Sequence, residues 1–412
     1  MIDEVRSEDA EECQLHSAAS ATVLPWCAMA ALPTLSPQAR RILQLSRDDR
    51  AAARDAMAAL SIEAQTALVC EAPVSRRSEL IDLAPEPERL IPALPPAELC
   101  FTAKAVGLHD AGWLMEHATT EQITVCLDLD TWQDFVPDRS KLDEWLEAFA
   151  DSGDETLLRS TRAMDLELLV LQMKSRISVL LKPNEDGWAA PAHARTIDGQ
   201  FYFFALHEKD DLAEVESLLR TLFQNDYWVY FRLLQGVIWE LVPETEESAL
   251  RWRTGRLQDL GFPTWEESMK IYGFIRPEAR SELPEGEPYR EVGEWPLPIW
   301  MPNLPVQASA EQSIFRAMAE LPEEERRPRL YAFLALANRI AVAERMPLGD
   351  SETIPLAIER AAEVTSRGLD YLSRENAADP PEVLRRVTFE RLFRVGHNLA
   401  ESGLGKARTP KP

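Results

Sequence analysis

Aromatic residues are concentrated in one stretch of the chain, and this stretch constrains the fold more than any other feature. Residues 223–274 hold 11 of the 32 aromatic residues in 52 of the 412 positions, including Trp228, Trp239, Trp252 and Trp265. Large rings supply much of the apolar area that a domain can bury, and here they stand at helical spacings. We therefore expect this stretch to form a packed helical core.

The apolar pattern around these rings indicates helices. Leucines, valines and a tyrosine in residues 212–241 recur at three- and four-residue intervals, as on one face of an amphipathic helix. The pattern predicts one helix, or two helices broken near Asn225 and Asp226. Thr264 and Glu267 have the spacing of a capping box and predict the start of another helix.

A short segment before these helices has a different period. The residues ARTIDGQFYFFAL read as two strands on either side of an Asp198-Gly199 turn. We expect one small β-hairpin in the middle of an otherwise mainly α-helical protein.

Three stretches nearer the N-terminus look alike: LSIEAQTALVC from Leu60, LPPAELCFTAKAVG from Leu94 and ATTEQITVCLDLD from Ala118. Each has a Ser, Pro or Thr start, an acidic residue in the first turn and then an apolar face, which predicts a short capped helix. Because the starts are 34 and 24 residues apart, we expect a loose array of short helices and not a strict repeat. The pattern is similar to the intracellular superhelical domain of MgtE-type magnesium transporters.

Composition and pattern together suggest how the chain is divided. The predicted parts are a disordered acidic arm at 1–36, a short-helix array at 37–181, an aromatic-rich central domain with the hairpin at 182–276, a proline-rich linker or wrapping loop at 277–306, a C-terminal helical domain at 307–403 and a basic tail at 404–412.

Charge and cysteine content limit the partners. With 69 acidic and 44 basic residues the net charge is −25, which repels nucleic acids and anionic membranes and favours basic proteins. No apolar run approaches the length of a membrane helix, and the N-terminus does not resemble a secretory signal. The five cysteines form no Cys-x-x-Cys pair, so we expect free thiols and a cytoplasmic location.

One basic cluster is a candidate ligand-binding site; it consists of Arg251, Trp252, Arg253 and Arg256. Guanidinium groups near a glycine could hold a phosphate or carboxylate through paired hydrogen bonds. Helical pairing of Arg251 with Glu247 and of Arg256 with Asp259 would neutralise the cluster instead, and we favour this second interpretation.

One acidic cluster is a candidate metal site; it consists of Asp128, Asp130 and Asp134, with Asp138 shortly after. Clustered carboxylates can bind Mg²⁺ or Ca²⁺. A helix C-terminus followed by an aspartate-capped turn explains the same residues without a metal, and this is the favoured interpretation. The histidines lack zinc-ligand spacing, no catalytic constellation is visible, and no cofactor is expected.

Two stretches carry a wider likeness: Trp252-Arg253 followed by GRLQDLGFPTWEESMKIY, and LFRVG at 392–396. Through them the chain resembles, over most of residues 40–405, an uncharacterised family of bacterial helical proteins, a resemblance that implies no activity. Our leading hypothesis is a non-enzymatic scaffold or regulatory protein that binds other proteins through the concave face of the array. The alternative is a protein, possibly an enzyme, that responds to a ligand or divalent cation, with an anion site at Arg251–Arg256.

Overall fold

The protein is mainly α-helical, as predicted. The computed structural model describes residues 36–185, 187–207, 212–284, 286, 288 and 312–408, with side chains as far as residue 402. Within these ranges it has twenty α-helices and two small antiparallel sheets. None of these helices is both long and apolar enough to cross a membrane. Three predicted segments lie wholly or partly outside the described residues, namely the arm at 1–36, the linker at 277–306 and the tail at 404–412.

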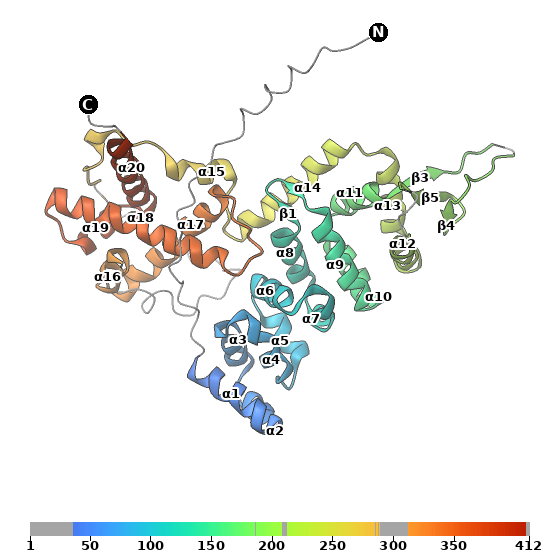
Figure 1. The fold of residues 1–412 in the computed structure, drawn as a ribbon, viewed down its shortest axis with the longest axis horizontal. Coiled ribbons are helices and arrows are strands. Elements are labelled where there is room, and N and C mark those ends of the chain that lie inside the picture. Colours follow the sequence, from blue (N-terminus) through green and yellow to red (C-terminus); the bar gives the residue numbers. More distant parts are fainter. Residues whose placement is uncertain are drawn as a thin grey trace, which may run out of the picture. The chain divides into compact units, whose positions relative to one another are not determined.

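The N-terminal part is a succession of short helices, from blue to green in Figure 1. Their bounds are α1 (Pro37–Asp48), α2 (Arg50–Ala58), α3 (Ile62–Glu71), α4 (Val74–Asp82), α5 (Pro87–Ala93), α6 (Pro96–Val106), α7 (Gly112–His117), α8 (Thr120–Asp130), α9 (Arg139–Asp151), α10 (Asp154–Ala163) and α11 (Leu166–Arg176). From α3 to α8 each helix packs against the helix two positions further on, so the predicted array is present. This stacking continues beyond residue 181, because α10 contacts α12 and α11 contacts α13.

Capping residues both start these helices and join them. Thr119 and Gln122 form the predicted capping box at the start of α8, with N–H to oxygen distances of 2.9 and 3.1 Å. The Gln122 side chain also donates to the carbonyl oxygens of Ile91 and Leu94, both at 2.8 Å. These carbonyls belong to the end of α5, where the helix leaves them without partners of its own. One glutamine therefore caps α8 and fixes it to α5.

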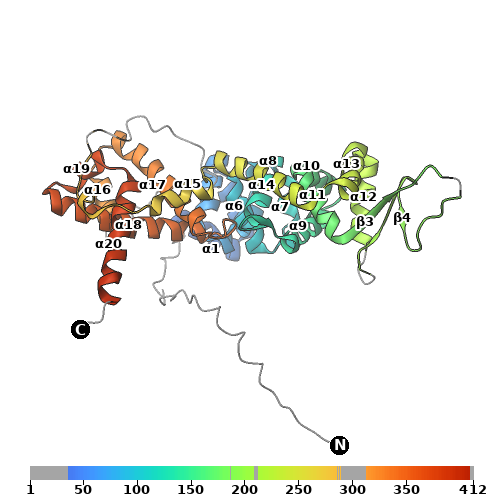
Figure 2. The same cartoon turned by 90° about the horizontal axis from the view of Figure 1, so that it is seen from above.

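Two sheets interrupt the helices. Their strands are β1 (Trp132–Gln133) with β2 (Val136–Pro137), and β3 (Ile177–Leu181), β4 (Arg195–Thr196) and β5 (Phe201–Ala205) in the order β3-β5-β4. The predicted hairpin is β4–β5, and the Asp198 carboxylate accepts from the amides of Gln200 and Phe201. The sequence reasoning missed β3, which follows α11 without a break, and the β1–β2 ribbon. In Figure 2 the larger sheet lies next to α13, which β3 contacts.

The central helices are α12 (Ala213–Asn225), α13 (Tyr227–Trp239), α14 (Val242–Asp259) and α15 (Trp265–Met269). Of the two alternatives predicted for this segment, two helices broken near Asn225 and Asp226 is the one found, and the Asp226 carboxylate caps α13 by accepting from the Val229 amide at 3.3 Å. The predicted capping box of Thr264 and Glu267 is also present at the start of α15.

The prediction that the aromatic stretch is a packed core holds for part of its rings and is wrong for the others. Of the eleven aromatic residues in 223–274, Tyr230 and Phe262 are buried, and Phe223, Phe231 and Tyr272 pack half-buried against the core. Trp228, Trp239 and Trp252 are 65%, 56% and 51% exposed. Helical geometry explains the two on α13, since residues 228 and 239 fall on one face while the opposite face is buried. These large rings are placed on the surface and not in the core.

The C-terminal part consists of α16 (Ser313–Ala319), α17 (Glu323–Ala343), α18 (Thr353–Asn376), α19 (Pro380–Arg386) and α20 (Phe389–Arg408). Helices α18 and α20 cross in close contact (Figure 2). Gly368 and Gly396 lie at the crossing, and a Cβ on either would stand 2.0 Å from a carbonyl oxygen of the other helix. Only glycine lets the two backbones approach this closely.

Hydrogen bonds connect the C-terminal helices with the rest of the unit Pro33–Pro412. Lys104 of α6 donates to the carbonyl oxygen of Gly349 at 2.8 Å and to Asp350 at 2.7 Å. Asn338 of α17 donates to the carbonyl oxygen of Gly261 at 3.0 Å. The turn after α17 is thereby fixed against the array, and the turn before α15 is fixed against α17.

Candidate functional site

The structure divides the predicted arginine cluster into two pairs. Arg251 and Trp252 point to the surface of α14, and the Arg251 guanidinium lies 5.9 Å from the centre of the Trp252 ring. Arg253 is buried and Arg256 is half-buried. Only the second pair faces the predicted aspartates, so the two candidate clusters, more than a hundred residues apart in the chain, meet in space.

Arg256 is held by two carboxylates from the array. Its Nε and Nη2 donate to Asp128 at 2.6 and 2.8 Å, and its Nη1 and Nη2 donate to Asp165 at 2.9 and 2.6 Å. Burial alone would lower the pKa of Arg256, but the hydrogen bonds that it donates to Asp128 and Asp165 raise it well above its usual range. The carboxylates that neutralise Arg256 are these two, a correction to the expected pairing with Asp259.

Arg253 has a different environment because its partners are main-chain oxygens. Its Nε donates to the carbonyl oxygen of Asp128 at 2.8 Å, and Nη1 approaches that of Asp134 at 3.4 Å. Its guanidinium also lies 5.0 Å from the centre of the Trp132 ring. Burial lowers the pKa of Arg253 to about 10, so the side chain stays cationic at neutral pH. A buried cation that donates its hydrogen bonds to neutral groups can accept a further anionic partner.

Each predicted metal-binding aspartate is paired with a different cation. Asp128 binds Arg256, Asp130 binds Lys104 at 2.6 Å, and Asp134 lies 3.5 Å from Arg345. Across the part of the chain that the structure describes, no three Asp, Glu, His or Cys side chains come together as a metal site would need.

Asp138 accepts from the amides of Ser140 and Lys141 at the start of α9, as the alternative interpretation expected. Asp128 and Asp130 stand in the last turn of α8, where that interpretation placed them. The divalent-cation site remains a prediction from sequence, and the observed partners favour ion pairs.

A cavity of about 470 Å³ lies beside Arg253, and we call it the junction cavity. Its walls come from the β1–β2 ribbon, from α14 and the start of α15, and from the end of α17 with the turn that follows. Arg345 stands at this cavity with its guanidinium 5.3 Å from the ring centres of both Phe135 and Trp265. The cavity thus combines two arginines with several aromatic rings.

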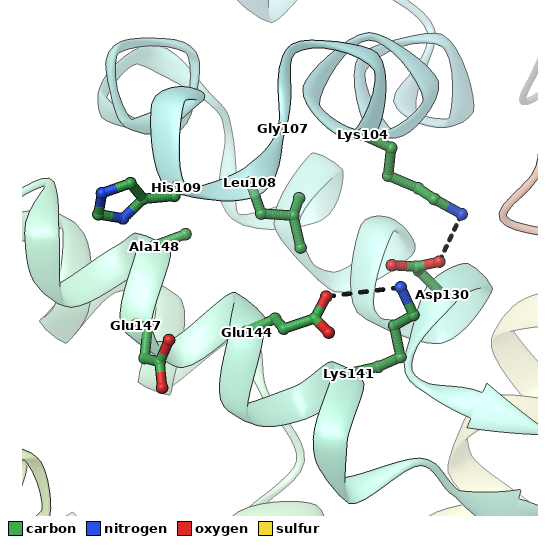
Figure 3. Close-up of a pocket in the computed structure, with 9 residues that line it drawn as sticks. All are labelled: Lys104, Gly107, Leu108, His109, Asp130, Lys141, Glu144, Glu147 and Ala148. Carbon is green, nitrogen blue, oxygen red and sulfur yellow. Dashed lines mark hydrogen bonds and ion pairs between the residues drawn. The ribbon is translucent and has the colours of Figure 1, made fainter.

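A second cavity of about 330 Å³ lies between α6, α8 and α9 (Figure 3). Four of its charged side chains form two ion pairs: Lys104 with Asp130 at 2.6 Å, and Lys141 with Glu144 at 3.5 Å. Burial would lower the pKa of Lys104, but its hydrogen bonds to Asp130 and Asp350 raise it. Because both of its lysines are paired with carboxylates, this cavity is a weaker site for an anionic ligand than the junction cavity.

A third feature is an exposed apolar face at α13 and the start of α14, which we call the aromatic surface. It consists of Tyr227, Trp228, Phe231, Trp239, Leu241 and Val242. Phe231 stacks between Trp228 at 6.0 Å and Tyr227 at 6.2 Å, so three of these rings form a continuous layer. Leu241 is 62% exposed. Exposed apolar side chains gathered over neighbouring elements are a mark of interaction sites.

These features define a helical protein with an array of stacked short helices, a charged junction and an exposed aromatic face. The chain belongs to a family of unknown function, DUF6178, which matches residues 54–408. No curated protein and no solved structure matches the chain. The similarity of the array to MgtE-type superhelical domains stays a prediction.

Sequence reasoning found part of the junction and missed the rest. Arg253 and Asp134 were singled out, whereas Arg345, Trp132 and Trp265 were not. Two positions in the sequence could have pointed to these tryptophans: Trp132 lies within the run of aspartates, and Trp265 lies next to Thr264 of the capping box. Arg345 follows a helix end with no motif around it, so only the fold brings it to the cavity.

Proposed function

We propose that this protein is a scaffold that binds another protein through the aromatic surface. One observation supports this: five of the fourteen large apolar side chains that are strongly exposed within the described residues belong to this surface and fall in the 16 positions 227–242. Tryptophan is the residue type most enriched among side chains that dominate binding energy at protein interfaces. Water covers about half or more of Trp228 and Trp239 in the isolated chain, and a partner would remove that cost.

The aromatic surface is a better candidate than the face of the array that the sequence suggested. Between residues 36 and 134 no large apolar side chain is strongly exposed. The array helices therefore use their apolar residues on each other. The hypothesis of protein binding is kept, and the contact is moved from the array to α13 and α14.

The charges around the aromatic surface indicate the chemistry of the partner. Glu240, Glu244 and Glu247 are exposed next to its apolar residues, and the chain carries a net charge of −25. An apolar segment flanked by lysine or arginine complements both features, because opposite charges steer association and exclude acidic partners. We therefore propose a partner that presents an apolar face with basic residues at its edges.

Site-specific photocrosslinking tests this proposal. A photoreactive phenylalanine analogue is placed at residue 239 in the aromatic surface or, as a control, at Leu356, which is 44% exposed on α18. Each protein that crosslinks at 239 but not at 356 is then purified and titrated against the wild-type chain and the W239S variant. Loss of a tryptophan worth about 2 kcal/mol at an interface weakens binding about 30-fold.

Equal affinity for wild type and W239S would refute the proposal. So would crosslinks that join only two copies of this chain, since they would make the face a self-association surface. Because Trp239 is exposed, its replacement should change the free energy of unfolding by no more than about 0.5 kcal/mol. A loss of binding can therefore be separated from a loss of folding.

A further inference from the structure

We propose that the junction cavity binds a small molecule with a flat apolar body and one carboxylate group. The cavity, at about 470 Å³, has the size of known small-molecule sites, which span about 300–1,000 Å³. This inference is independent of the proposed protein-binding function, because the cavity and the aromatic surface share no residue.

One cation on the cavity wall has no anionic hydrogen-bond partner. Arg253 is buried and lines the cavity. It uses its Nε and Nη1 on main-chain oxygens and meets no carboxylate of the wall at hydrogen-bond distance. An anionic ligand in the cavity would supply a charge-assisted partner for this guanidinium.

The balance of charge on the wall favours a single negative charge. The residues that line the cavity include two arginines, Arg253 and Arg345, and one carboxylate, Asp134. Asp134 lies 3.5 Å from Arg345, while the nearby Asp128 carboxylate is taken up by Arg256 outside the cavity. Of the two lining arginines only Arg253 has no carboxylate at hydrogen-bond distance, so a ligand with one charge matches it better than a doubly charged phosphate does.

The remaining wall explains why the ligand should be flat and apolar. Phe135 and Trp265 meet edge to face at 6.4 Å, and Arg345 lies against both rings. The other apolar residues of the wall are Leu129, Leu250, Leu257, Phe262, Met346 and Leu348. Aromatic rings and a stacked guanidinium offer flat surfaces to a planar ligand.

The backbone at the cavity also has the strain found at binding sites. Asp134 and Arg345 both have left-handed conformations, with φ of 57° and 53°. Non-glycine residues in this region cost about 1–3 kcal/mol each and persist where surrounding structure holds them. Here the two strained residues face each other across their ion pair at the cavity.

Calorimetric titration of the full chain with matched aromatic compounds tests the proposal. The probes are naphthalene-2-carboxylate, its neutral amide, 2-naphthyl phosphate and further pairs of bicyclic aromatic acids with their amides. The variants are R345Q, which removes a half-exposed charge at the cavity, and R251Q, a matched control on the surface of α14. Hydrogen exchange of the three wall stretches, 129–135, 250–265 and 342–348, is measured with and without the acid.

We expect at least one acid to bind at millimolar or lower concentration and its amide to bind about 10- to 100-fold more weakly, because a charge-assisted hydrogen bond is lost. R345Q should weaken the acid by a similar factor and R251Q should not. All three wall stretches should exchange more slowly in the complex. The proposal would be overturned if acid and amide bound with equal affinity, or if wild type and R345Q bound the acid equally well. It would also be overturned if the naphthyl phosphate bound more tightly than the acid, or if no acid bound at all.

Discussion

The crossing of α18 and α20 allows a sharp prediction: Gly368→Ala should destabilise the protein although alanine is the better helix former. A Cβ at residue 368 would lie 2.0 Å from the carbonyl oxygen of Leu392, whereas real Cβ contacts are essentially never shorter than 3.0 Å. The helices would have to separate by about 1 Å, and a gap of that size removes roughly a quarter to a half of the dispersion energy of each contact across it.

The size of the effect follows from what surrounds the crossing. Leu369, Leu372, Leu392 and Val395 are all completely buried, so separation of the helices loosens a full layer of core contacts. Inserting one carbon into such a core costs about 1–3 kcal/mol and occasionally more. The gain from helix propensity is only about 1 kcal/mol. Because the overlap at 2.0 Å is severe, we take the upper end of this range, about 3 kcal/mol, and expect a net loss of about 2 kcal/mol in the free energy of unfolding.

Gly255 provides the matched control. It lies inside α14, and a Cβ there would meet nothing within 4 Å. Gly255→Ala should therefore stabilise the chain by about 0.5–1 kcal/mol. Urea denaturation followed by circular dichroism measures both variants, and hydrogen exchange locates the change in α18 and α20. A Gly368→Ala variant as stable as wild type would show that the helices do not approach as closely as described.

Three further predictions concern buried ionisable groups. Arg77→Met should cost about 3–5 kcal/mol in chemical denaturation, because it removes the cation that pairs with buried Glu98 at 2.5 Å; a cost below 1 kcal/mol would contradict this. Burial lowers the pKa of His397 in the folded state. The free energy of unfolding should therefore be highest above a pH of about 6.5 and should decrease as the pH falls through the folded-state pKa. In the His397→Gln variant this part of the pH dependence of unfolding should be absent. Burial raises the pKa of the Cys70 thiol, and a hydrogen bond with Cys100 together with burial raises the pKa of the Cys126 thiol. After iodoacetamide treatment, peptide mass spectrometry should therefore find both cysteines unmodified in the native protein and alkylated in the unfolded protein. Rapid labelling of the native protein would count against their burial.

Local features of the fold could be read from the sequence because local chemistry determines them. Four such features depend on only a few adjacent residues each: the capping boxes at Thr119 and Thr264, the break at Asp226 and the turn at Asp198. The helical array followed from the same rules applied repeatedly. Strand β3 was missed because it continues directly from α11, with no turn residue between them.

The site could be predicted only in part because it depends on contacts distant in sequence. Arg256 lies three residues from Asp259, yet it pairs with Asp128 and Asp165 from the array. Only the packing of α14 against α11 brings these groups together. The tryptophans were misjudged for a local reason. Their number suggested a core, but Trp228 and Trp239 lie on the side of α13 opposite its buried residues and are exposed.

A selection of displayed peptides on the native protein tests the central claim, that the aromatic surface binds a protein partner, most directly. The best peptides are then titrated against wild type and a W228S/W239S variant. We expect peptides with an apolar helical face flanked by lysine or arginine, and binding at least about 30-fold weaker in the variant. Peptides that are acidic, or that bind both proteins equally well, would contradict the claim.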